Sequence, residues 1–130
     1  EAEQAVGICD FPRGTAAARA TIANRREALR RLDRLDTPPA QVPVQRLLER
    51  ALGASATANE QRVVDAKADE RAVAALPATG VANDCDGYTP TASQSNADDR
   101  TSATLKERFV ERWNALPARA KAPDWDASRI

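Results

Sequence analysis

The segment 44–76 carries polar side chains on a helical face that is otherwise apolar. Ser55, Asn59 and Arg62 follow i, i+4, i+7 spacing, which places all three on one side of a helix. Asp69 lies roughly one to two turns beyond them on the same segment. Burying such groups is costly unless they are paired. The spacing therefore predicts either a structural network between helices or a site for a ligand or partner.

An arginine interrupts the apolar stripe of the preceding segment in a similar way. Arg25 lies between Ile22 and Leu29, the positions that a helix would turn toward its neighbours. If the stripes of the helices face one another, Arg25 meets the polar side chains of segment 44–76. The alternative is a snorkelling arginine whose stem packs while its head stays in water. The candidate ligand or partner patch is Arg25, Ser55, Asn59, Arg62 and Asp69.

The chain contains no histidine, and this removes the commonest general base and the commonest metal ligand. No Gly-rich phosphate loop, nucleophile elbow or dinucleotide fingerprint is present. Catalysis would have to use paired carboxylates, as in glycosidases. We expect no catalytic residues, no metal and no cofactor, because spacing singles out no pair among the available acids. These acids are Glu49, Glu60, Asp65, Asp69, Glu70, Glu107 and Glu111.

The two cysteines, Cys9 and Cys85, lack the short spacing of a metal site. The sequence begins at Glu1 and has no methionine, and we interpret it as the mature part of an exported protein or as a trimmed product. In an oxidising compartment the two cysteines would form one disulfide, closing a loop of about 75 residues and stabilising the fold by on the order of 4 kcal/mol. The alternative is a pair of buried thiols in the cytosol.

Composition favours an all-α protein. Hydrophobic residues make up 42% of the chain, yet alanine supplies much of this share, so a core must come from closely packed helices. Strand-forming residues are sparse and do not alternate. Basic and acidic residues balance at 19 each, which argues against nucleic-acid binding. No apolar run of the length that spans a membrane, about 18 residues, is present.

The expected fold is a single helical domain over residues 1–130, a small antiparallel bundle of three main helices with one disulfide. The aromatic residues Phe109 and Trp113 share a helical face with Leu105 and Leu116, and the core is expected to close on that face. A variant of this fold adds a short fourth element from the tail. In chain order the sequence predicts an extended arm at 1–14, helices at 15–35, 44–76 and 98–116, and a tail at 117–130. An earlier start of the third helix, at Thr89–Pro90, stays open.

The chain resembles uncharacterised secreted proteins and lipoproteins of actinobacteria. The resemblance covers most of the chain and is carried by Ala23–Leu32, Leu47–Leu52 with Ala54–Ser55, Lys106–Asn114 and Asp124–Ile130. It implies an exported helical-bundle module and brings no catalytic residues or ligand.

We therefore expect a non-enzymatic extracytoplasmic module that binds an unknown protein or a cell-envelope partner. Two alternatives stay open. One is a carrier of a small apolar ligand inside the bundle, which requires a cavity of several hundred cubic ångströms. The other is a carboxylate-dependent hydrolase, which requires two acidic groups about 5 to 9 Å apart in a cleft.

Overall fold

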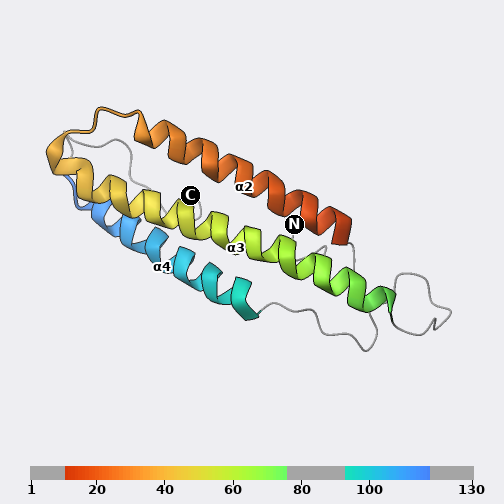
Figure 1. Ribbon diagram of the computed structural model, residues 1–130. Coiled ribbons are helices and arrows are strands. Elements are labelled where there is room, and N and C mark those ends of the chain that lie inside the picture. Colours follow the sequence, from red (N-terminus) through yellow and green to blue (C-terminus); the bar gives the residue numbers. More distant parts are fainter. Residues whose placement is uncertain (1–10, 76–92, 118–130) are drawn as a thin grey trace.

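The computed structural model describes residues 11–75 and 93–117 (Figure 1). These residues form helices and no strands, so the expected all-α class and helical bundle are confirmed for the described part of the chain. The elements are α2 (Phe11–Asp33), a short 3-10 helix η1 (Pro39–Gln41), α3 (Val42–Ala74) and α4 (Ser93–Asn114).

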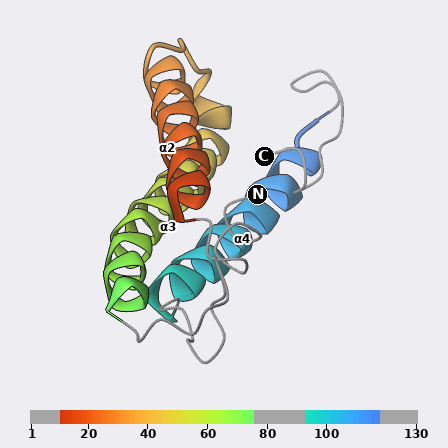
Figure 2. The same cartoon turned by 90° about the vertical axis from the view of Figure 1, so that its right-hand side faces the viewer.

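The longest helix, α3, is the centre of the arrangement. Both α2 and α4 run antiparallel to α3 and pack extensively against it, whereas α2 and α4 hardly contact each other. Figure 2 shows α2 and α4 diverging towards the end where α4 finishes. The three apolar stripes therefore do not meet around one axis, and α3 alone faces both neighbours.

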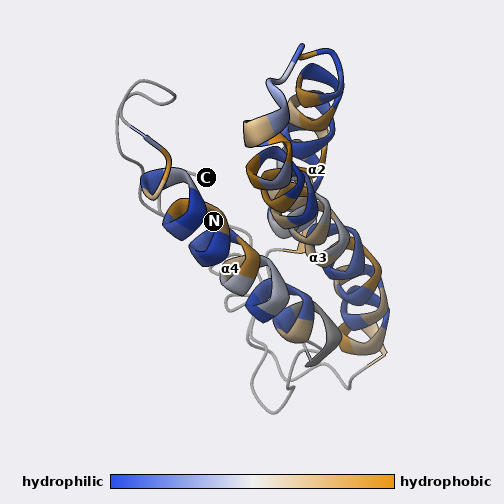
Figure 3. Ribbon diagram, turned by 90° about the vertical axis from the view of Figure 1, so that its left-hand side faces the viewer, coloured by the Kyte–Doolittle hydropathy of each residue, from blue (hydrophilic) through white to orange (hydrophobic). Residues whose placement is uncertain are grey.

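Small side chains on α3 set how closely the helices approach. Ala51 and Ala58 have no exposed surface, and Ala18 of α2 is also buried. An alanine at a crossing point adds little volume, so the neighbouring backbone approaches more closely than it does over leucine. Figure 3 shows that each helix alternates apolar and hydrophilic segments, as amphipathic helices do.

The aromatic face of α4 is in the core as expected. Leu105 and Phe109 are buried, and the rings of Phe109 and Trp113 lie 6.0 Å apart between centroids with a tilt of 34°. Aromatic pairs prefer such tilted or offset arrangements. Phe11, at the start of α2, is buried as well.

Helix boundaries differ from the expected ones at the amino-terminal ends. α2 begins at Phe11, so residues 11–14 are helical and not part of an extended arm. Pro12 fits because the first turn of a helix needs no N–H donor there. α4 begins at Ser93, five residues before Asp98, which agrees with the alternative of an earlier start. Near the start of α2, Pro12 and Gly14 indicate a break, although they lie in the first turn of the helix. Near the start of α4, Ser93 and Ser95 indicate a break, although they belong to the helix.

Several predictions fall outside the described residues. Cys9 and Cys85, residues 1–10 of the arm, and the tail beyond Pro117 are not described, so the disulfide and the short fourth element stay predictions. Within the described ranges, no helix combines the length and the apolar character needed to cross a membrane.

The close approach of the helices at Ala51 allows a prediction about stability. Ala51→Leu should lower the free energy of unfolding by about 1–3 kcal/mol, because a larger side chain forces α3 and its neighbours apart. Ala68→Leu on an exposed position of α3 is the matched control and should leave stability nearly unchanged. Urea unfolding monitored by circular dichroism measures both. Equal effects of the two substitutions would contradict the importance of close packing at Ala51.

Candidate functional site

Four of the five predicted patch residues contact one another. The Arg25 Nε donates a hydrogen bond to Ser55 Oγ at 3.4 Å, joining α2 to α3. The Asn59 side-chain amide donates to the Ser55 backbone oxygen at 2.8 Å, and Arg62 donates to Asn59 Oδ1 at 3.3 Å. The patch is therefore a connected network whose buried members, Ser55 and Asn59, are hydrogen-bonded.

The carboxylate that completes this network was not predicted from the sequence. Arg62 forms an ion pair with Asp99 of α4, and their side chains are 18% and 33% exposed. From the sequence, Asp99 is only a charge near the start of a helix. Asp99 precedes Ser102 by three residues and Lys106 by seven, so the three residues share one face of a helix. This spacing was the available signal that Asp99 lies on the inward face of α4.

A buried hydroxyl adds a second tie between α3 and α4. Ser102 Oγ donates to the backbone oxygen of Ala51 at 3.2 Å, and both residues are buried. A bond from a side chain to the backbone of another helix requires close approach, which Ala51 permits because it has no side chain beyond Cβ. The network and this bond together fix the position of α4 along α3.

The fifth predicted residue, Asp69, lies elsewhere along α3. It is seven positions beyond Arg62, about 10 Å along the axis, and is 1% exposed. Asp65, one turn before it, is also buried. It accepts a hydrogen bond from Gln61 at 2.8 Å through Oδ1, while its buried Oδ2 has no hydrogen-bond partner among residues 11–75 and 93–117.

Three hollows among the described residues differ in the carboxylates that line them. One hollow between α2 and α3 is lined by the single carboxylate Glu60, and another, at the connection between these helices, by Asp36 alone. A third hollow, between α3 and α4, is lined by no carboxylate. None of these three hollows therefore contains the two facing carboxylates that a carboxylate-dependent hydrolase requires. Nor do the described residues contain a group of three or more Asp, Glu, His or Cys side chains positioned to hold a metal ion.

One hollow, the loop-end groove, has a volume of about 380 Å³ and lies between the end of α2, the start of α3 and the second half of α4. Its wall is mainly apolar, and Leu35 on its rim is 60% exposed. The groove is lined by Leu32, Leu35, Asp36, Thr37, Pro38, Gln41, Val44, Gln45, Leu48, Phe109 and Trp113.

Two cations, on α2 and α4, lie near each other outside the lining of this groove. Lys106 precedes Phe109 by one turn, and Arg25 precedes Leu32 by two turns. Burial lowers the pKa of the Lys106 ammonium below its usual value, and the nearby charge of Arg25 lowers the pKa further. Among the described residues no carboxylate pairs with either side chain; Arg25 contacts only the neutral Ser55 hydroxyl.

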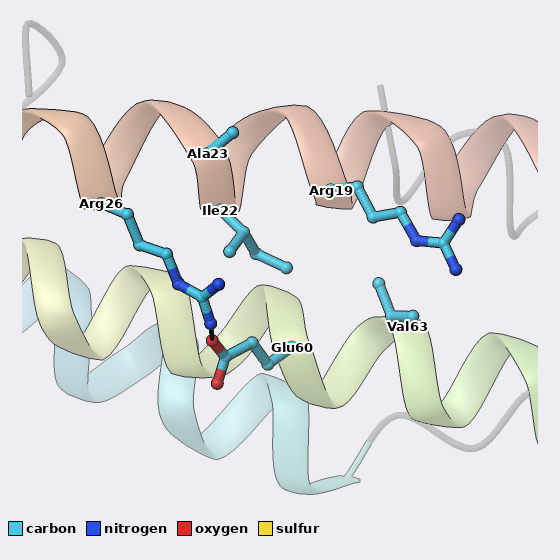
Figure 4. Close-up of a pocket in the computed structure, with 6 residues that line it drawn as sticks. All are labelled: Arg19, Ile22, Ala23, Arg26, Glu60 and Val63. Carbon is cyan, nitrogen blue, oxygen red and sulfur yellow. Dashed lines mark hydrogen bonds and ion pairs between the residues drawn. The ribbon is translucent and has the colours of Figure 1, made fainter.

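A second hollow, of about 330 Å³, lies between α2 and α3 on another side (Figure 4). An ion pair between Arg26 and Glu60 bridges the two helices there, while Arg19 extends towards Val63. The Arg26 and Glu60 side chains are 59% and 46% exposed. This ion pair lies at one end of the hollow and neutralises the one carboxylate that lines it.

Comparison of the chain with protein-family models, with curated proteins and with solved structures finds no match. Function is therefore inferred from the residues and surfaces of this chain.

The Arg62–Asp99 pair should contribute more to stability than the Arg26–Glu60 pair. A double-mutant cycle of Arg62→Ala and Asp99→Ala should give a coupling free energy of about 1 kcal/mol, because partial burial limits screening by water. The same cycle on Arg26 and Glu60, also an ion pair between helices, should give less than about 0.5 kcal/mol because both side chains are exposed. Chemical unfolding measures both cycles. Equal coupling in the two pairs would show that burial does not strengthen the first.

Proposed function

We propose that this protein is a non-enzymatic binding module that receives an amphipathic helix of a partner protein in the loop-end groove. The observation that carries the proposal is that α2 and α4 both pack on α3 but hardly on each other, with an apolar groove where they diverge. In a four-helix bundle a further helix fills such a space. Apolar grooves between helices are a common mode of helix recognition.

Charge supports an acidic partner helix. Lys106 is partly desolvated beside Arg25, and the described residues offer neither of them a carboxylate. A partner helix with apolar residues at i, i+3, i+4 and i+7 and an acidic residue on its flank would fill the groove and place a carboxylate near both cations. Complementary charge of this kind adds mainly specificity and association rate.

A carrier of a small apolar ligand is the second candidate, because the groove volume of about 380 Å³ falls within the range of small-molecule sites. The exposed rim at Leu35 favours the helix. A small apolar ligand gains most from an enclosed cavity, whereas a helix leaves its polar face in water.

The test uses a fluorescein-labelled amphipathic peptide with leucines at helical spacing and glutamates on its polar face, measured by fluorescence anisotropy with the full chain. Leu35→Asp should weaken binding by about tenfold, equivalent to 1.4 kcal/mol, because it places a charge on the apolar rim. Val64→Asp is the matched control, since Val64 is 59% exposed on α3 and lies outside the groove. Lys106→Glu should also weaken binding of this peptide.

Replacing the glutamates of the peptide by lysines should reverse the effect of Lys106→Glu. Three results would count against the proposal: no binding of either peptide, equal loss in the Leu35 and Val64 variants, or a groove already filled by the chain's own residues beyond Pro117. Nuclear magnetic resonance contacts between those residues and Trp113 would reveal the last.

We further propose that the module works outside the cytoplasm. The separation of Cys9 from Cys85 and the resemblance to secreted actinobacterial proteins support this location. Protein purified without reductant should have a mass lower by two hydrogen atoms than the reduced protein, because one disulfide has formed. Two thiols that react fully with an alkylating reagent before reduction would overturn the inference.

A further inference from the structure

We propose that a hollow between α3 and α4 binds a ligand through linked phosphate groups, held by three arginines. The hollow has a volume of about 400 Å³. It shares no lining residue with the loop-end groove, so this site is independent of helix binding. Its lining is Arg50, Ala97, Arg100, Thr101, Thr104, Leu105 and Arg108.

The three arginines line one hollow from two helices, and all three are exposed. Arg100 and Arg108 lie eight residues apart on α4, about 12 Å along its axis, with Thr104 halfway between them. Arg50 comes from α3 and adjoins Ala51, whose backbone oxygen accepts the hydrogen bond from Ser102. Because that bond fixes α3 against α4, it also fixes where Arg50 faces α4.

The hollow contains positive charge without compensation. No carboxylate lines it, and in the described part of the chain none of Arg50, Arg100 and Arg108 has an ion-pair or hydrogen-bond partner for its side chain. Elsewhere on the molecule Arg26 and Arg62 are paired across helices. In a chain with 19 basic and 19 acidic residues, three arginines that line one hollow without a partner among the described residues are a local excess of charge that an anion would neutralise.

The donor set selects phosphate over a simple carboxylate. Each guanidinium presents parallel N–H donors that fit phosphate oxygens in a bidentate manner. The hydroxyls of Thr101 and Thr104 donate to backbone oxygens of their own helix, at 3.1 and 3.0 Å, so the arginines supply the donors. One carboxylate carries a single charge, whereas two linked phosphates carry enough charge and oxygens to engage three guanidinium groups.

The experiment titrates inorganic pyrophosphate into the full chain by isothermal calorimetry. Arg100→Gln and Arg108→Gln should each weaken binding by about tenfold, because each removes charge-assisted hydrogen bonds. Arg34→Gln is the matched control, since Arg34 is exposed, lies outside the hollow and has no side-chain partner among the described residues. Circular dichroism confirms that all variants keep their helix content.

A second arm distinguishes a free phosphate compound from a lipid headgroup. Vesicles of phosphatidylcholine with phosphatidic acid are sedimented with the protein and its variants. Pyrophosphate binding that depends on Arg100 and Arg108 supports a soluble ligand, and vesicle binding alone with the same dependence supports a lipid phosphate. The proposal is overturned if neither probe binds, or if Arg34→Gln weakens binding as much as Arg100→Gln.

Discussion

The fold depends on the close approach of α3 to its neighbours, which the small side chains on its buried face permit. Ala51 shows the consequence most directly, because its backbone oxygen is near enough to α4 to accept a hydrogen bond from the Ser102 hydroxyl. A larger residue there would separate the helices and break that bond. The positions of Arg50 beside α4 and of the Arg62–Asp99 pair both depend on this contact.

Polar groups that already have hydrogen-bond partners within the protein serve the structure, whereas groups without such partners are available for binding. Asn59 and Ser55 are bonded within the protein, so a ligand would have to replace bonds that already exist. Lys106 and Arg50 are in the opposite condition, since they carry charge without an anionic partner among the described residues. A binding partner gains more free energy by pairing with such cations than by replacing existing hydrogen bonds. The candidate sites are therefore the loop-end groove near Lys106 and the hollow lined by Arg50, and not the predicted patch.

Periodicity predicted the three helices and which polar side chains share a face of α3, because both are properties of one helix at a time. The spacing of Asn59 and Arg62 is visible in the sequence, and so is the aromatic face of α4. The Arg62–Asp99 pair and the convergence of Arg50 with Arg108 depend on how far α4 is shifted along α3. No single-helix pattern contains that shift. The early start of α2 was missed because Pro12 breaks a helix interior but suits its first turn.

The near absence of contacts between α2 and α4 has a consequence for how the molecule opens. Among the described residues each outer helix packs mainly against α3, so the packing of one on α3 depends little on the packing of the other. Backbone amides in the middle of α3 are then exposed only when both attachments are lost, and they should exchange with solvent most slowly. The α2–α3 hairpin is joined by the short connection 34–41 and is local in sequence. It is therefore the unit that can form first during folding.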